Sequence, residues 1–319
     1  MRLHYRVNDN EIEIIRCFGN DSKVILPDRI CGLPVTKAAP YTFSDHKSQE
    51  DAEYEVYESG GHILGEDEIY VLAGPEVEEI IFPDTMCEIG NYIFYGCKNL
   101  KRLEFSDALI HLGSGAFTGC ISLSSLWVNM KAGHKSCVKE ILGELWQRID
   151  VTFFYEEDGE RADLVFPVHY EEAVENTPAR LLYTQHHGSG NNYRQCFYNN
   201  EMDYRKYDSL FSVAVVWDKV EVLTDMALGR LAYPYELMEK YERLYQEMIV
   251  TKYKDALKYL IGREKFQQIK LLSERDLWNV EMIDYALELA SGQQKAEISS
   301  YLMNEKQERF SRKRKVFEL

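Results

Sequence analysis

The sequence lacks any long apolar run. Its longest mostly apolar stretch covers residues 210–217, far short of the roughly 20 residues that a membrane-spanning helix needs. The charged start, Met1–Arg6, is followed by no apolar segment, so no secretory signal is expected. These two absences predict a cytoplasmic protein without a membrane partner.

Positive charge is also scarce, because 37 lysines and arginines stand against 53 aspartates and glutamates, for a net charge of −16. Nucleic acid and anionic lipid surfaces would repel such a chain, so neither is expected as its main partner. The seven cysteines are an odd number in a chain with no expected export signal. This count indicates reduced and mostly packed thiols.

What the sequence does contain is an internal repeat of 23 residues. The apolar and glycine positions of Val77–Leu100 return in Leu100–Leu123, as the pairs Phe82/Phe105, Ile89/Leu112, Gly90/Gly113, Phe94/Phe117, Gly96/Gly119 and Cys97/Cys120. The same register gives two apolar columns, which are Ile80, Leu103 and Leu126, then Phe82, Phe105 and Val128. A fixed period of this length predicts a solenoid, whose units bury their apolar faces only by stacking.

Each unit begins with a short strand, Glu79–Phe82, whose alternation points Ile80 and Phe82 into the core. Cys97 and Cys120 occupy a small position that we expect to be buried, where cysteine acts as a compact apolar residue. A redox or metal role is the alternative for these two thiols. The repeat itself sets their 23-residue spacing, so a structural role is expected.

These residues resemble the BspA-type (Treponema-like) leucine-rich repeat, over about residues 10–130. Val77–Cys97 and Leu100–Cys120 follow its pattern, and Val24–Pro27 with the residues up to Phe43 is similar to its first repeat. Ala38-Ala39 replaces the usual Ile-Gly, and Ser106 replaces a proline. The resemblance implies a protein-recognition scaffold without catalysis or a cofactor.

An acidic insertion, residues 45–74, separates the first repeat from the next. Between Asp45 and Glu79 there are 12 acidic residues and one basic residue, Lys47. A solvated surface excursion is one interpretation. The other interpretation is an acidic surface that selects a basic partner. Added salt would then weaken the binding of that partner.

Residues 131–215 do not repeat and predict a connector. We expect a helix over residues 135–148, which would cap the repeat stack. A hairpin follows, because the strand-like runs Val151–Tyr155 and Leu164–Val168 flank an Asp-Gly turn. Residues 171–176 are predicted to form a short helix that stops before Pro178.

The glycine-rich segment His186–Cys196 is predicted to be a loop, and it carries the alternative function of an enzyme or metal-binding subunit. His186, His187 and Cys196 could ligate zinc, although adjacent histidines do not easily share one ion. Cys196 with one histidine could form a catalytic dyad. A metal analysis would discriminate this alternative, and in the structural interpretation Arg194 holds an acidic neighbour.

Residues 216–319 predict an all-helical domain. We expect one helix to start at Pro234, and further helices over 253–261, 265–272, 281–290 and 294–310. A weaker repeat with a period of 30 residues relates Ala256 to Ala286 and Gly262 to Gly292. This 30-residue echo faintly resembles ankyrin-type helix pairs. An irregular helical bundle explains the same residues equally well.

The sequence therefore predicts an α+β protein, in which a short leucine-rich-repeat solenoid (residues 1–130) precedes a hairpin connector and a helical domain. The predicted function is recognition of another protein by a scaffold or adaptor, through outward positions of the repeat strands, with the helical domain as a second candidate surface. These positions form two columns, which are Ile25, Ile81, Glu104 and Trp127, then Glu79, Arg102 and Ser125. Self-association is a further hypothesis, because open sheet edges invite pairing.

Overall fold

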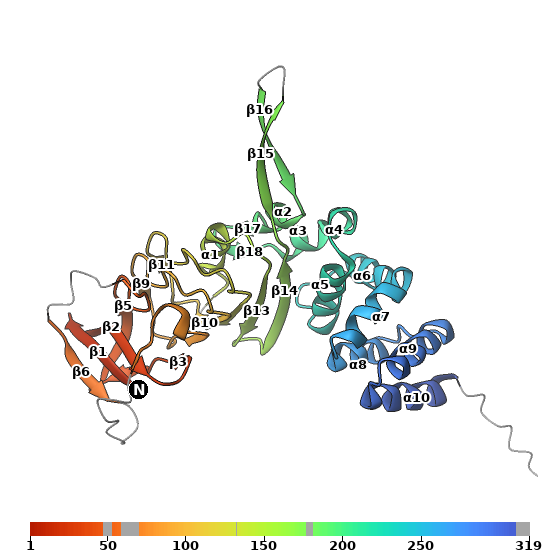
Figure 1. Cartoon of the computed structure of the whole chain (residues 1–319), viewed down its shortest axis with the longest axis horizontal. Helices are drawn as coiled ribbons and strands as arrows, with labels where there is room; N and C mark the ends of the chain where they lie inside the picture. Colours follow the sequence, from red (N-terminus) through yellow and green to blue (C-terminus); the bar gives the residue numbers. More distant parts are fainter. Residues whose placement is uncertain (47–52, 59–69, 132, 177–180, 311–319) are drawn as a thin grey trace, which may run out of the picture. The chain divides into compact units, whose positions relative to one another are not determined.

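The computed structural model describes residues 1–46, 53–58, 70–131, 133–176 and 181–310. The chain divides into two compact units, Met1–Leu210 and Phe211–Leu319, which are strand-rich and helical respectively (Figure 1). The segment predicted as a connector lies within the first unit, up to Leu210. Both strands and helices are present, so the α+β class is confirmed.

A six-stranded sheet, here called the repeat sheet, forms one wall of the solenoid. Its strands lie in the spatial order β14 (Glu160–Phe166), β13 (Ile149–Tyr155), β12 (Ser125–Met130), β10 (Arg102–Ser106), β8 (Glu79–Ile81) and β3 (Lys23–Ile25). All neighbours are parallel except β13 and β14, which form a hairpin. Each of the five parallel strands comes from a successive coil, as a solenoid requires.

The 23-residue register is confirmed at the inward positions of this sheet. Ile80 pairs with Leu103, and Leu103 pairs with Leu126. Phe82 and Phe105 are also both buried, and the Phe82 amide donates to the Glu104 carbonyl oxygen, 2.9 Å away. Equivalent residues of neighbouring coils therefore lie on adjacent rungs of one core.

A second sheet, of eight strands, joins the N-terminal strands to short strands of the repeats. Its main path is β11 (His111–Leu112), β9 (Glu88–Ile89), β5 (Leu33–Ala38), β2 (Glu11–Gly19), β1 (Arg2–Asn8) and β6 (Glu55–Glu58), with β4 (Arg29–Ile30) on β5 and β7 (Tyr70–Val71) on β2. The predicted acidic insertion supplies β6 and β7, so part of it belongs to this sheet. The Gly60-Gly61 pair of the insertion, which the sequence predicts to form a turn, lies outside the described residues.

The helix predicted over residues 135–148 is shorter in the structure, where α1 covers Val138–Glu144. The end of α1 and the residues that follow it contact the last repeat coil. The Glu144 carboxylate accepts a hydrogen bond from the Phe117 amide at 3.0 Å, and the Gln147 side chain, just after the helix, donates to the carbonyl oxygens of Cys120 and Leu123. In the interior of a repeat stack, a following coil would bind these backbone groups. Here side chains bind them instead, which is what a cap of a repeat stack does.

The hairpin predicted around residues 156–160 is confirmed as β13–β14, with Tyr155 opposite Glu160. The helix predicted over 171–176 is wrong. This segment is β15 (Tyr170–Asn176), which pairs antiparallel with β16 (Leu181–His187). A six-residue helix is below the length that is stable alone, whereas pairing with a second strand satisfies the backbone groups on one side.

The rest of the first unit consists of short elements. A one-turn helix, η2 (Gly74–Glu76), precedes β8, and the small hairpin β17 (Phe197–Tyr198) and β18 (Glu201–Met202) lies between α2 (Gly190–Arg194) and α3 (Tyr204–Ser209). All seven cysteines are free thiols. Burial raises the pKa of Cys97 to about 12, which suits the predicted structural role.

The second unit contains α4 (Phe211–Trp217), α5 (Val220–Ala232), α6 (Glu239–Thr251), α7 (Tyr253–Gly262), α8 (Phe266–Glu274), α9 (Val280–Gly292) and α10 (Ala296–Phe310). The predicted helix start at Pro234 is wrong, because Pro234 lies in the turn before α6. The 30-residue echo has a structural counterpart, since the amides of Lys265 and Lys295 donate equivalent bonds to Leu260 and Ala290. In the described residues no helix is long and apolar enough to cross a membrane.

Candidate recognition face on the repeat sheet

The predicted outward columns lie in register across the repeat sheet. Ile25 pairs with Ile81, Ile81 with Glu104, and Glu104 with Trp127. In the second column, Glu79 pairs with Arg102, which pairs with Ser125. Ile25, at the β3 edge, is 54% exposed. The other five predicted site residues are half-buried. We call this outward surface of the repeat sheet the recognition face.

Four side chains form a stacked row across the recognition face. The Arg102 guanidinium carbon lies 4.0 Å from the centroid of the Trp127 ring, and the Trp127 and Phe154 ring centroids are 5.5 Å apart. At the far end, the Arg161 guanidinium carbon lies 5.2 Å from the Phe154 centroid. Cation–π contacts of this kind attract the guanidinium to the ring face. We call these four residues the cation–aromatic row.

The row explains why Trp127 is half-buried instead of exposed. Its cover includes Arg102 and Phe154 of the same unit. An aromatic ring held between a cation and a second ring loses little further side-chain freedom when a partner binds, which lowers the entropic cost of association.

The cations of the row and of its neighbour Lys131 are paired with carboxylates. Arg102 donates to Glu104 at 2.7 Å, and Arg161 binds Asp163 through two bonds of 2.8 and 2.7 Å. Lys131 lies 2.9 Å from Glu156 and 3.1 Å from Asp84, and these carboxylates raise the pKa of Lys131. Each of these three cations is thus compensated by at least one carboxylate, which restricts the motion of the side chains along the row.

A shallow slot of about 630 Å³ opens along the row. Trp127 and Phe154 give it aromatic surface, and polar groups surround them, from Glu104, Asn129, Lys131, Glu160 and Arg161. Aromatic surface with a few placed polar groups is the usual composition of a binding slot.

Phe154 and Arg161 were not among the predicted site residues. They lie on β13 and β14, which extend the repeat sheet beyond the 23-residue period, because Val151 pairs with Leu126 at a spacing of 25 residues. The alternation of Val151, Phe153 and Tyr155 was the available signal for this additional strand.

The segment predicted as the loop His186–Cys196 is a strand end followed by a helix, so that prediction is wrong. His187 ends β16, with its Nε2 atom 3.4 Å from a Glu172 oxygen, and α2 begins at Gly190. The His186 side chain lies outside the described residues. Cys196 is buried, and burial raises the pKa of its thiol to about 12, which does not suit a nucleophile. The described residues contain no group of three potential metal ligands.

Arg194, predicted to hold an acidic neighbour, binds carbonyl oxygens instead. Its guanidinium is buried and donates five hydrogen bonds, to the backbone of Leu142, Leu145, Gln147, Pro167 and Gly190. Burial lowers its pKa to about 10, so the group remains charged at neutral pH. Arg194 therefore joins α1, α2 and the segment after β14 into one structure.

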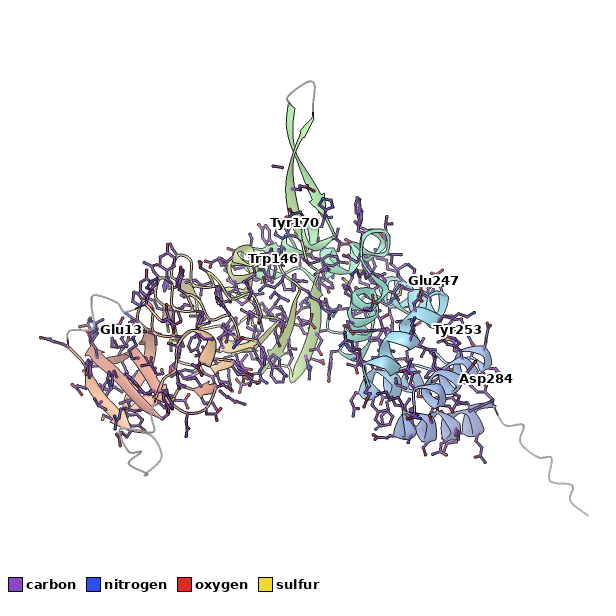
Figure 2. All side chains as sticks on the ribbon, in the orientation of Figure 1. Glu13, Trp146, Tyr170, Glu247, Tyr253 and Asp284 are labelled. Carbon is purple, nitrogen blue, oxygen red and sulfur yellow. The ribbon has the colours of Figure 1, made fainter. Side chains whose placement is uncertain are left out.

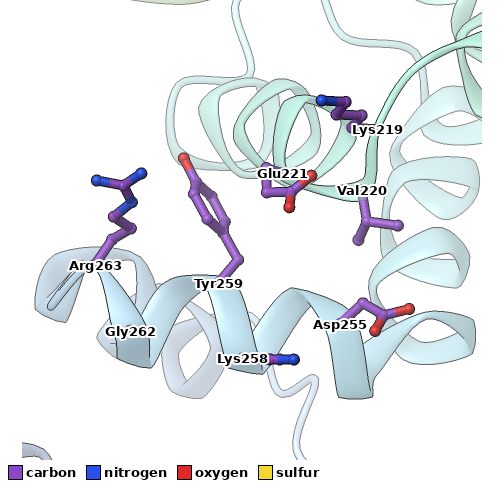
Figure 3. Close-up of a pocket in the computed structure, with 8 residues that line it drawn as sticks. All are labelled: Lys219, Val220, Glu221, Asp255, Lys258, Tyr259, Gly262 and Arg263. Carbon is purple, nitrogen blue, oxygen red and sulfur yellow. The ribbon is translucent and has the colours of Figure 1, made fainter.

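The helical unit carries a second hollow, of about 690 Å³, between the start of α5 and helix α7 (Figure 3). Cations and carboxylates both line it, from Lys219, Glu221, Asp255, Lys258 and Arg263. Because both signs of charge line the hollow, it does not favour a ligand of either charge. Trp146, after α1 in the first unit, is an exposed aromatic residue outside the recognition face (Figure 2).

Comparison with known proteins finds a match over the repeats. Residues 68–139 match the family model described as "BspA type Leucine rich repeat region (6 copies)". No curated protein matches.

Two solved structures are similar. A leucine rich cell surface protein from Faecalibacterium prausnitzii is 24% identical over 41% of this chain and 32% of its own, with a TM-score of 0.28. A leucine rich repeat protein from T. pallidum is 19% identical over 42% of this chain and 75% of its own, with a TM-score of 0.24. The chain thus spans about a third of the length of the first. The predicted resemblance is confirmed over residues 68–139, which supply β8, β10 and β12 and match the BspA-type leucine-rich repeat model.

Proposed function

We propose that this protein is a non-enzymatic scaffold that binds another protein through the recognition face, with the cation–aromatic row at the centre of the contact. The observation that carries the proposal is the row itself, in which Trp127 and Phe154 lie between two paired arginines along a slot. Tryptophan and arginine are the residue types that dominate binding energy at interfaces. The repeat architecture supports a binding role in general.

The local charge compensation favours a partner segment that buries apolar or aromatic surface over Trp127 and Phe154. Binding there should depend weakly on salt. A contact through the acidic insertion would instead select a basic partner and weaken steeply as salt screens it. The salt dependence of the affinity therefore distinguishes these two binding modes. Fractionation of the producing cells tests the expected cytoplasmic location.

Trp127→Ala is expected to weaken binding of the partner about 30-fold, which corresponds to about 2 kcal/mol, the size of an interface hot spot. Its effect on folding should stay near 1 kcal/mol, because the residue lies on the outer surface of the sheet and loses mainly its ring contacts. The measurement is affinity capture with the wild-type protein from the producing cells, followed by titration calorimetry of the purified partner against both variants.

Trp146→Ala is the matched control, because it removes an exposed tryptophan elsewhere in the first unit and should leave the affinity unchanged. If Trp127→Ala unfolds the protein, Trp127 is a packing residue. If it folds and binds the partner at full affinity, the recognition face is not the binding surface.

A further inference from the structure

The β15–β16 hairpin forms a two-stranded sheet of its own. Seven residue pairs join the strands, from Tyr170 opposite His187 to Asn176 opposite Leu181. Among the described residues no third strand pairs with either of them (Figure 1). A hairpin of this size is only marginally stable in water, and each outer edge presents unpaired backbone donors and acceptors.

The two edges of this hairpin differ in their charge. β15 carries Glu171, Glu172 and Glu175, whereas Leu181–His187 contains no aspartate, glutamate, lysine, arginine or proline. Proteins protect open edges with charged residues and proline. The other described edge strand of this length, β14, carries Glu160, Arg161 and Asp163. The β16 edge is thus a long edge without such protection.

We propose that β16 pairs antiparallel with β16 of a second copy of this chain, so that two hairpins join into one four-stranded sheet. Pairing centred on Thr184 places it opposite the partner's Thr184 and uses all seven residues of the strand. It brings no like charges together. A two-fold contact of this kind is closed and self-complementary.

The alternative contact, β15 with β15, is opposed by charge. A full seven-residue pairing there would be centred on Ala173 and would place Glu171 opposite the partner's Glu175, twice by symmetry. Directly opposed like charges destabilise a sheet. The sequence of the hairpin therefore selects the β16 edge for self-association. This inference is independent of the recognition face.

The test is the mass of the full chain in solution, by sedimentation velocity across a wide dilution series. The wild type is expected to form dimers that dissociate on dilution. Thr184→Lys, which opposes two lysines at the centre of the contact, is expected to raise the dimer Kd at least about tenfold. Ala173→Lys is the matched control, since Ala173 is exposed and lies opposite Thr184 on β15, and it should leave the Kd unchanged.

Cross-linking gives a second measurement that does not depend on how well a charged variant folds. Cys31 is the exposed native thiol, so Cys31→Ser supplies the background. In it, Thr184→Cys should form a covalent dimer on mild oxidation and Ala173→Cys should not, because opposed Cβ atoms in a sheet lie about 5 Å apart, near the reach of a disulfide. A wild type that is monomeric at every concentration, a dimer that survives Thr184→Lys, or a strand of another protein on this edge would overturn the proposal.

Discussion

Gly113→Ala is expected to lower the free energy of unfolding of the first unit by about 3 kcal/mol, the upper part of the range for overpacking. A Cβ atom on Gly113 would lie 2.2 Å from the Gly90 carbonyl carbon and from the Asn91 nitrogen. These are backbone atoms of the preceding coil, and they cannot rotate away. The Gly113 amide also donates to Ile89 at 2.8 Å, so the coils cannot separate without loss of that bond. Urea denaturation followed by circular dichroism measures the effect.

The matched control is Gly143→Ala in α1, where an added Cβ atom meets nothing within 4 Å. This change should raise stability by about 0.5–1 kcal/mol, because alanine favours a helix over glycine. If Gly113→Ala had the same free energy of unfolding as the wild type, the backbones of the two coils would not approach as closely as the structure shows.

Arg194→Met is expected to cost about 3–5 kcal/mol, because it leaves five carbonyl oxygens with one donor fewer each in the interior. Arg194→Lys should recover only a minor part of this loss, because a single ammonium group cannot reproduce the planar set of donors. Urea denaturation of both variants measures the loss.

Arg205→Met, an exposed arginine on α3, is the control and should change stability by less than about 0.5 kcal/mol. A fully stable Arg194→Met protein would show that α1, α2 and the segment after β14 hold together without the guanidinium.

The repeat sheet was predictable because each coil imposes the same constraint on the sequence. Ile80, Leu103 and Leu126 occupy equivalent buried rungs, so the apolar signal adds up at a fixed spacing. The predicted outward columns followed from the same register. Three of the six predicted site residues, Arg102, Glu104 and Trp127, lie in or beside the cation–aromatic row.

The other half of the row could not be read from the period. Arg161 lies on the return strand of an antiparallel hairpin. Its separation from Trp127 along the sequence therefore does not follow the repeat period and does not indicate that the two side chains lie on one row. The partner predicted for Arg194 was wrong for a related reason, since four of its five acceptors come from residues 27–52 positions away. The wrong helix at residues 171–176 arose because local composition does not reveal the strand that pairs with it.

The most direct test of the proposed recognition face is fluorine NMR of the full chain labelled with 5-fluorotryptophan. The four tryptophans are Trp127, Trp146, Trp217 and Trp278, and single substitutions to phenylalanine assign their resonances. Titration with the captured partner should shift the Trp127 resonance and leave the other three in place. A shift of Trp146 or Trp217, which are 56% and 61% exposed, with an unchanged Trp127 resonance would contradict the account and place the contact elsewhere.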